Sequence, residues 1–549
     1  MDGARAEESR IRELVAKLGD SPSAPSLSDV EPAASSAPPV SVLYRRPDEE
    51  RHERGTAPDF FGDLHLDRIV AAAVAGREEY DLLPFFQTAL TDPEAISYRQ
   101  EVMRDLEKPE TRVAIDAFAD QMRLMRKHLA SEAKAYYVRE KQRWHLAAAE
   151  SFTEATQLLA RDLAAARPSS AGLRNLQAAL DRYLASEAFR DLATEARRLA
   201  GQLAEIRFSL LIHEGSVRVR LFEGETDYSA AVEDTFRKFA EGMTSELRLD
   251  PDDGFGLNHV DAEILSRVAL LNAEVLDALA RFSECWRTFV APLLAQFDRE
   301  VQFYLAWLDF IGRFRQAGLP ICYPQLTTER SDVSCRETYD LALADQLLRE
   351  TGSRGPVSIV PNDFALHGPE RVLVVTGPNQ GGKTTFARTF GQLHHLVRLG
   401  CPLAGREARL FVCDALFTHF EKEEDVASLQ GKLEDDLVRV KAILDRATPD
   451  SVVVMNEIFS STTVEDALFL ARQVLASILD FDLLCVCVTF LDELSTLNDR
   501  TVSLVAAVDP QAPASRTYKL ERRPANGLAY ALAEKHRLTY EQFKERIRP

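Results

Sequence analysis

The stretch "RVLVVTGPNQGGKTTF", residues 371–386, constrains the fold of this 549-residue chain more than any other. It fits the pattern G-x-x-x-x-G-K-[ST] through Gly377, Gly382, Lys383 and Thr384, and an apolar run precedes it. Glycines let backbone N–H groups wrap around phosphates, the lysine reaches the β- and γ-phosphates, and the hydroxyl faces Mg²⁺. The pattern predicts a strand, a phosphate-binding loop and a helix, with a nucleoside triphosphate as ligand.

Short apolar runs dominate the chain after about residue 345. The runs "SIVPNDFAL", "ARLFVCD", "SVVVMNE", "LLCVCVTF" and "TVSLVAAV" alternate with helical stretches such as "FARTFGQLHHLVRLG". This alternation predicts an α/β domain with a largely parallel sheet over residues 346–549. Cys485 and Cys487 share one face of a predicted strand, which favours core thiols over a metal site.

Residues 59–345 carry apolar side chains at three- and four-residue spacing, which predicts helices. The longest predicted helix runs from about Val260 to Ala317, and Pro292 inside it kinks the helix or ends a turn. Helices of that length build levers or coiled arms. Within this region, residues 214–230 alternate with period two around Gly224, which predicts a small hairpin. The fold class expected is therefore α+β and multidomain: a long all-helical core or lever domain, then an α/β P-loop domain.

The composition sets limits on location and partners. Residues 1–58 are rich in Pro, Ser and Ala and then in charge, which predicts a flexible leader. No run of 18 or more apolar residues occurs, so we expect no membrane span and a cytoplasmic location. The net charge of −20 argues mildly against a DNA-binding protein, because counterion release favours basic surfaces.

A phosphate-binding loop needs an acidic residue beside it, which a second strand must supply. Glu457 directly ends the apolar run of "SVVVMNEI", and a carboxylate there can polarise the attacking water. The position before it, where a metal-associated Asp is usual, holds Asn456. An acidic residue that merely closes a strand is the structural alternative.

These segments resemble the ATPase domain of the MutS family. That family reads G-P-N-M-G-G-K-S-T and then D-E-I-G-R-G-T-S-T-x-D-G, against "GPNQGGKTT" and "NEIFSSTTVED" in this chain. "DPEAISYRQEVMRDL" and "LDFIGRFRQAGLPICYP" also resemble family segments, so the resemblance covers roughly residues 59–549. It implies an ABC-type ATPase that uses ATP and Mg²⁺, forms a homodimer and closes a clamp on DNA. Residues 525–547 would be the dimerisation helices; a plain amphipathic surface helix is the alternative.

The resemblance also implies site residues. Nucleotide binding falls to Gly377, Pro378, Asn379, Gly381, Gly382, Lys383, Thr384 and Thr385, with Asn362 near the adenine; Lys383 and Glu457 are the catalytic candidates; Thr384 and Asn456 would hold the metal. Asn362 beside a proline is equally typical of a turn.

Other candidates concern the partner's site in a dimer. Lys432 lies where the family has a Ser-Thr-Phe signature, and we hypothesise that it supplies positive charge to the opposite nucleotide. A solvated lysine is the alternative. Ser461, Thr462 and Asp466 lie in the segment that couples the two sites, and Thr489 precedes the position of a family histidine. For this segment the local alternative is a capping pair, Thr463 with Asp466.

The departures from the family shape the function expected. The mismatch-reading Phe-x-Glu domain and the connector domain have no counterpart; Phe152-Thr153-Glu154 and Phe282-Ser283-Glu284 fall in predicted helices and are taken as structural. Asn456 in place of Asp, and Phe490 in place of His, predict slow ATP hydrolysis.

Two functions remain open. The first is an ATP-gated dimeric clamp that binds DNA by structure or without selectivity, in DNA repair or recombination. The second is an ATP-dependent interaction or switch protein that has lost DNA binding. Arg218 and Arg220 of the predicted hairpin could face phosphates together or form a solvated face.

Overall fold

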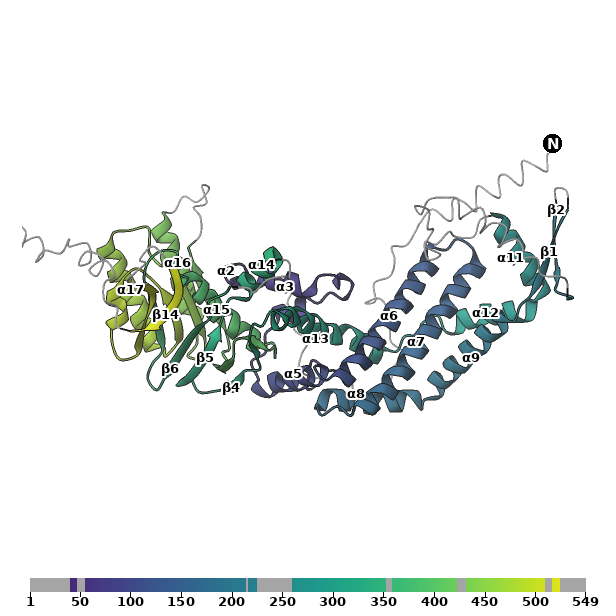
Figure 1. Ribbon diagram of the computed structural model, residues 1–549, viewed down its shortest axis with the longest axis horizontal. Coiled ribbons are helices and arrows are strands. Elements are labelled where there is room, and N and C mark those ends of the chain that lie inside the picture. Colours follow the sequence, from purple (N-terminus) through teal and green to yellow (C-terminus); the bar gives the residue numbers. More distant parts are fainter. Residues whose placement is uncertain are drawn as a thin grey trace, which may run out of the picture. The chain divides into compact units, whose positions relative to one another are not determined.

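The computed structural model describes residues 40–46, 55–213, 216–224, 259–351, 358–421, 431–508 and 516–523. The chain forms two compact units (Figure 1). The helical unit holds Val113–Arg167 and Gln177–Ala295, and the sheet unit holds Val40–Arg112, Pro168–Leu176 and the chain from Gln296 onward. The sheet unit thus takes in more of the chain than the predicted ATPase domain at 346–549. No helix among the described residues is long and apolar enough to cross a bilayer.

Long amphipathic helices build the helical unit. They are α6 (Pro109–Lys134), α7 (Val138–Ala166), α8 (Ala171–Leu184), α9 (Glu187–Ala204), α11 (His259–Leu271) and α12 (Ala273–Cys285). Helices α7, α9 and α12 pack against one another. The boundary between the units falls inside α6, α8 and α13 (Pro292–Gln316). The two Phe-x-Glu segments lie in α7 and α12, so their helical prediction is confirmed.

A buried histidine joins three segments of the helical unit. His145 on α7 is 5% exposed; its Nδ1 lies 3.1 Å from Glu132 on α6, and its Nε2 lies 3.1 Å from the Trp286 carbonyl oxygen. Burial alone would lower the pKa of His145, but the bond and charge of Glu132 and the carbonyl raise it overall. Both ring nitrogens face acceptors, which favours the imidazolium.

The single long helix predicted from Val260 to Ala317 is wrong. The structure has α11, α12 and α13 there, interrupted at Asn272 and between Cys285 and Pro292. Pro292 is the first residue of α13, where its missing N–H costs no helical hydrogen bond. Periodicity alone did not reveal these breaks, because the apolar spacing resumes after each one.

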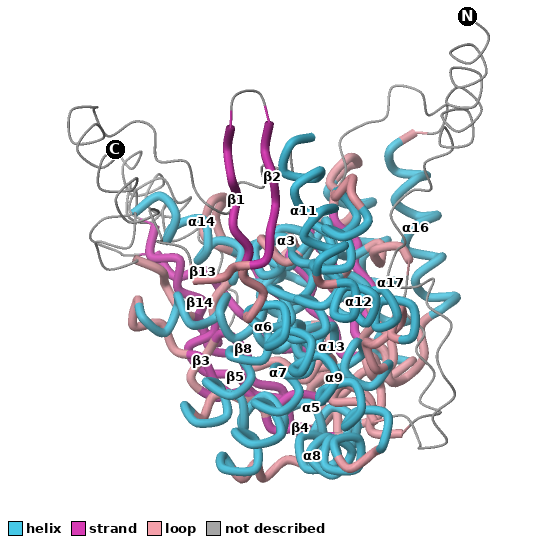
Figure 2. Tube along the Cα trace, turned by 90° about the vertical axis from the view of Figure 1, so that its right-hand side faces the viewer, coloured by secondary structure: helices cyan, strands magenta, loops and turns pink. Residues whose placement is uncertain are grey.

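The predicted hairpin exists with a different partner strand (Figure 2). Strand β2 (Ser216–Leu221) pairs antiparallel with β1 (Phe208–His213), upstream, so the turn is not at Gly224. Cross-strand pairs share a face, which puts Phe208, Leu210 and their partners Leu221 and Val219 on an apolar side. Arg218 and Arg220 share the other side.

The core of the sheet unit is a six-stranded sheet in the order β10-β11-β12-β7-β13-β14. The first five strands are parallel and β14 is antiparallel. Their bounds are β7 (Val372–Thr376), β10 (Leu416–Phe420), β11 (Val452–Asn456), β12 (Leu484–Val488), β13 (Thr501–Val508) and β14 (Arg516–Arg522). Helix α15 (Lys383–Val397) packs on β11 and β12. Helices α16 (Lys432–Arg446) and α17 (Val464–Asp480) share a buried cluster with β7, β11 and β12 that includes Cys485 and Cys487, so the core-thiol prediction is confirmed.

A second sheet has the order β4-β9-β5-β6 and is mostly antiparallel. It consists of β4 (Gln325–Thr327), β5 (Asp332–Thr338), β6 (Asn362–His367) and β9 (Glu407–Phe411), and β3 (Ile321–Cys322) pairs with β8 (Leu403–Ala404) nearby. The predicted strands at "SIVPNDFAL" and "ARLFVCD" therefore belong to this sheet rather than to the parallel one. The remaining elements are α2 (Phe60–Asp63), α3 (Leu66–Val74), η2 (Glu78–Tyr80), α4 (Leu83–Gln87), α5 (Pro93–Leu106), α14 (Leu341–Thr351) and η3 (Asp492–Thr496).

Part of the predicted flexible leader is packed. Val42 and Leu43 are each 1% exposed. Glu300 on α13 accepts from the Val42 N–H at 2.8 Å, and the Tyr304 hydroxyl donates to the Val42 carbonyl at 2.5 Å. Buried Arg99 donates to the Leu43 carbonyl at 3.0 Å. The segment packs because its apolar side chains are buried and its backbone bonds to the side chains of Glu300, Tyr304 and Arg99. Residues 1–39 and 47–54 lie outside the described residues.

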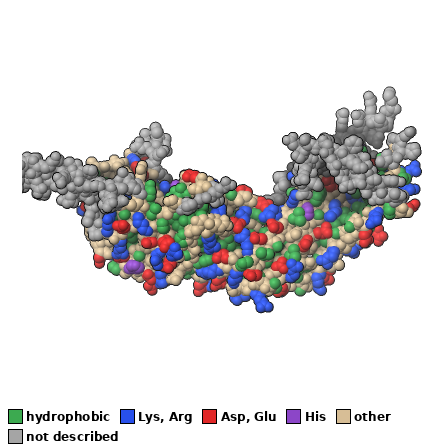
Figure 3. Space-filling model, in the orientation of Figure 1, with side chains coloured by type: hydrophobic (Ala, Val, Ile, Leu, Met, Phe, Trp, Pro, Cys, Tyr) green, Lys and Arg blue, Asp and Glu red, His purple; other side chains and the backbone are tan. Residues whose placement is uncertain are grey.

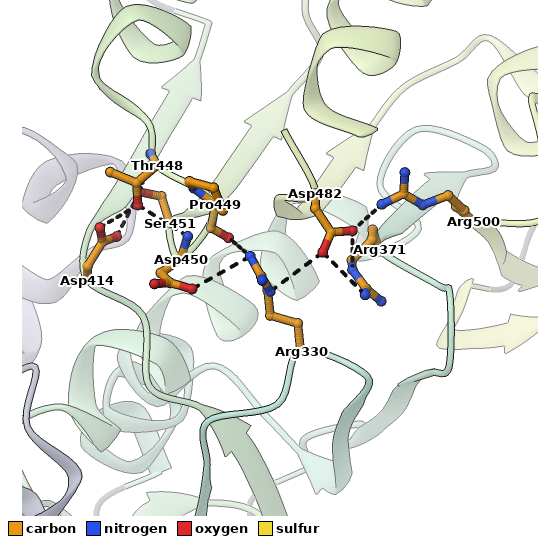
Figure 4. Close-up of polar contacts among 9 residues, drawn as sticks. All are labelled: Arg330, Arg371, Asp414, Thr448, Pro449, Asp450, Ser451, Asp482 and Arg500. Atoms are coloured by element: carbon orange, nitrogen blue, oxygen red, sulfur yellow. Dashed lines mark hydrogen bonds and ion pairs between the residues drawn. The ribbon is translucent and has the colours of Figure 1, made fainter. Parts of the chain in front are cut away.

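A polar network joins the two sheets at the amino ends of the parallel strands (Figure 4). Asp482, just before β12, accepts from Arg371, just before β7, at 2.8 Å and from Arg500, just before β13. Arg330, from the β4–β5 connection, lies 3.7 Å from Asp482 and donates to the Pro449 carbonyl. The network thereby attaches the second sheet to the parallel sheet at the amino ends of its strands.

Candidate nucleotide-binding site

A cavity of about 630 Å³ opens beside the loop between β7 and α15. Its lining comes from that loop, from the end of β11, from α14, from the start of β6 and from β14. A larger hollow of about 790 Å³ lies over the second sheet. Several arginines there already pair with carboxylates, as Arg336 does with Glu407 and Arg409 with Asp332, and no loop residue reaches it. The cavity at the loop is therefore the candidate site.

The glycines of the loop are required by its geometry. Gly377 has φ +125°, and a Cβ there would lie 2.8 Å from the Ala506 side chain on β13. Gly382 has φ +87° and begins α15 as its N-cap residue. The loop thus packs tightly against β13 and ends at a helix N-terminus, where backbone N–H groups favour an anion.

Lys383 is the first residue of α15, directly after the loop, and is 4% exposed. Its Nζ donates to the carbonyls of Gly377 at 2.8 Å and Pro378 at 3.2 Å. The ring of Phe490 lies against the same ammonium, 4.3 Å from Nζ to the ring centroid. Burial lowers the pKa of Lys383, and the charge of Glu457 opposes that shift.

The side chains of Thr384, in the first turn of α15, and Asn456, the last residue of β11, contact each other. The Thr384 hydroxyl donates to the Asn456 side-chain oxygen at 3.0 Å, and Asn456 is 7% exposed. A hydroxyl and an amide oxygen are hard donors of the kind that suits Mg²⁺, which also keeps water and phosphate ligands. The donor set therefore fits Mg²⁺. It carries one negative charge fewer than an aspartate would give.

Glu457 lines the cavity from the end of β11. Its backbone is left-handed, with φ 55°, and its N–H donates to the Val488 carbonyl at 2.9 Å. A non-glycine residue in this conformation costs on the order of 1 kcal/mol and is held by its surroundings. Glu457 thus lies at the cavity, and its catalytic role stays a prediction.

The cavity lining also has an apolar part. Leu343 and Leu347 of α14, Ile359 and Val360 before β6, and Tyr518 of β14 line it. Tyr518 also has a left-handed backbone, φ 55°, and its side chain is 49% exposed. A flat aromatic side chain and aliphatic neighbours suit a nucleobase.

The MutS domain V model matches residues 373–522, which contain the loop, β11 and Tyr518. This part of the chain belongs to the MutS family. Similar curated proteins include DNA mismatch repair protein MutS of Granulibacter bethesdensis, 35% identical over 124 residues, and of Caldicellulosiruptor saccharolyticus, 32% over 127 residues. DNA mismatch repair protein MutS 2 of Halobacterium salinarum is 34% identical over 135 residues. These stretches cover 23–24% of this chain and 13%, 15% and 16% of the three relatives.

Within the MutS domain, one cavity is lined by Lys383, Thr384 and Glu457 together with the loop residues Asn379, Gly381, Gly382 and Thr385. Asn456 does not line the cavity but accepts from the Thr384 hydroxyl beside it. Asn362 lines the cavity, but its amide bonds the backbone of β14. Sequence reasoning missed Tyr518. The period-two pattern of "RTYKLER" indicates a strand, but nothing in it indicates that this strand lies opposite the loop.

The candidates for a partner's site do not line the cavity of this MutS domain. Lys432, the first residue of α16, is ion-paired with Glu421, which also accepts from Ser460 at 3.0 Å. Thr463 caps α17 by accepting from the Asp466 N–H, which bears out the capping alternative. Ser461 is exposed, Thr462 is half-buried and Thr489 is 3% exposed. Their roles between subunits stay predictions, and most of the segment before Gly431 lies outside the described residues.

Proposed function

We propose that this chain binds ATP with Mg²⁺ at the loop cavity and hydrolyses it slowly. The observation that carries the proposal is that Lys383, Thr384 and Glu457 line one cavity beside a helix N-terminus, with Asn456 bonded to Thr384. The relatives are named as DNA mismatch repair proteins MutS, which supports an ATPase of that type.

The residues divide the chemistry among them. The loop N–H groups and Lys383 hold the phosphates, and Thr384 and Asn456 hold the metal, which neutralises phosphate charge when bound. Glu457 orients a water for attack on the γ-phosphorus and takes its proton, while the bond to the β–γ bridging oxygen breaks. Turnover is slow because Asn456 brings no charge and Phe490 offers no proton-transferring group.

Nucleotide binding and hydrolysis are separable by two substitutions. Lys383→Ala removes the phosphate-binding ammonium, and we expect ATP binding to be lost in a calorimetric titration. Glu457→Gln keeps the side-chain shape, and we expect it to bind ATP but to hydrolyse it about a hundredfold more slowly. Arg472→Ala, an exposed position on α17, is the control and should change neither quantity. Wild-type protein that does not bind ATP would disprove the proposal.

We further propose that ATP gates a homodimeric clamp on DNA, in repair or recombination. Arg218 and Arg220 share one face of the β1–β2 hairpin, where they suit a phosphate backbone. Helices α6, α8 and α13 run across the boundary between the two units and so offer levers from the ATPase to the helical unit.

The charge distribution favours a second candidate function, an ATP-dependent interaction protein without DNA binding. The net charge is −20, and on the face in Figure 3 basic and acidic side chains are interspersed over the described residues. Binding of duplex, branched and single-stranded DNA, titrated with salt with and without ATP, separates the two. The clamp predicts binding that weakens with salt and a shallower slope for Arg218→Glu/Arg220→Glu. An absence of binding at low salt leaves the interaction protein.

A further inference from the structure

Asn362 occupies the junction between the two sheets of the sheet unit. It is the first residue of β6, where its carbonyl accepts from the Thr338 hydroxyl at 2.8 Å. Its side chain points to the other sheet: the amide nitrogen donates to the Tyr518 carbonyl at 3.0 Å, and the amide oxygen accepts from the Leu520 N–H at 2.7 Å. One side chain thus bonds both a carbonyl and an N–H of β14, as a neighbouring strand would.

The bonds of Asn362 reach the aromatic residue at the cavity and the residue two positions after it. Tyr518 adopts a left-handed backbone, which a tyrosine rarely takes without outside support. Beside this contact, the Lys519 ammonium donates to the Pro361 carbonyl at 2.7 Å. Three polar bonds therefore hold residues 518–520 of β14 to the start of β6.

The same part of β14 also contacts the phosphate-binding loop. A Cβ on Gly382 would lie 3.6 Å from the Tyr518 ring and 3.7 Å from its Cα, an ordinary contact distance. The loop glycines Gly377 and Gly381 instead pack on Ala506 of β13. These two loop glycines therefore have their own support on β13, whereas the position of Tyr518 depends on β14 and Asn362.

We propose that Asn362 is a positioning residue for the nucleobase: it holds Tyr518 so that the aromatic ring forms one wall of the base site, and it does not read the base edge itself. Both polar atoms of its amide are already bonded to β14. This inference rests on the proposed function, because it concerns ATP at the same cavity.

Two probes distinguish a base site from a phosphate site. ATP presents a base as well as phosphates, whereas inorganic tripolyphosphate presents phosphates alone. Loss of the two net hydrogen bonds in Asn362→Ala should raise the Kd for ATP about tenfold and leave the Kd for tripolyphosphate within about twofold. Asn362→Asp keeps the acceptor for the Leu520 N–H but loses the donor to the Tyr518 carbonyl. It should therefore also weaken the binding of ATP and leave the binding of tripolyphosphate nearly unchanged. Tyr518→Ala should reproduce this pattern, and combining it with Asn362→Ala should add little.

Asn272→Ala is the matched control, because it also removes an amide-to-carbonyl bond, at 3.0 Å, but lies in the helical unit. Thermal unfolding of each empty variant checks that it folds. Equal losses for ATP and tripolyphosphate, or no loss for ATP, would overturn the positioning role. A wild-type protein that binds neither probe would instead refute the proposed function.

Discussion

The contact between Phe490 and Lys383 leads to a testable prediction about the affinity for ATP. The ammonium lies 4.3 Å from the ring centroid and donates to two loop carbonyls, so all its favourable directions are used before a ligand enters. To donate to a γ-phosphate, Lys383 must give up part of this arrangement. The ring therefore stabilises the empty state and opposes nucleotide binding.

The size of this opposition follows from burial. Cation–π contacts contribute about 0.5–1 kcal/mol when exposed and about 2 kcal/mol when desolvated. Lys383 is 4% exposed and Phe490 is 51% exposed, so we take about 1 kcal/mol for the pair. Phe490→Leu keeps an apolar side chain but removes the aromatic face. We predict that it lowers the Kd for ATP about fivefold.

Calorimetric titration of ATP into wild type and Phe490→Leu measures this difference. Phe481→Leu, a 44%-exposed phenylalanine next to α17 and away from the cavity lining, is the control. Phe490→His restores the family residue, and we expect it to raise the hydrolysis rate as well, because an imidazole can transfer protons. An unchanged or weaker affinity in Phe490→Leu would refute the reasoning.

Two further predictions concern stability. The pKa of His145 is raised above its unfolded value, so its stabilising contribution is full below about pH 6.5 and is lost as pH rises through the folded pKa. The protection of α7 amides from hydrogen exchange, relative to their intrinsic rates, should therefore fall as pH rises above about 6.5 in wild type and fall less in His145→Gln; equal profiles would contradict this. Tyr304→Phe leaves the buried Val42 carbonyl without its hydroxyl donor and should lower the unfolding free energy by about 1–3 kcal/mol in denaturant titrations, with Tyr136→Phe, 83% exposed, unchanged.

The sequence predicted the central strands of the parallel sheet well. Strands β7, β11 and β12 are continuous apolar runs because both of their faces are covered, and such runs stand out in a sequence. The placement of Lys383 and Glu457 at one cavity followed from the rule that parallel strands share a carboxyl edge. Strand order did not follow, because pairing β13 beside β7 depends on packing between distant segments.

Errors arose where a local pattern had two structural solutions. The alternation of β2 predicted a hairpin but not that its partner lay upstream. The apolar spacing of 260–317 fits one helix or three equally well. Asn362 illustrates the same limit within the site, since an Asn after proline indicates a turn or a ligand contact but not a bond to a strand 156 residues away.

The Asp482 network has a consequence for motion within the sheet unit. It anchors the second sheet to the parallel one at the amino ends of the parallel strands, through Arg330, and the bonds of Asn362 to β14 anchor it a second time. Two attachments at separate places restrict rotation of one sheet against the other more than either attachment does by itself. Loss of the Asn362 bonds would accordingly loosen the two sheets beside the cavity while the Arg330 attachment stays in place.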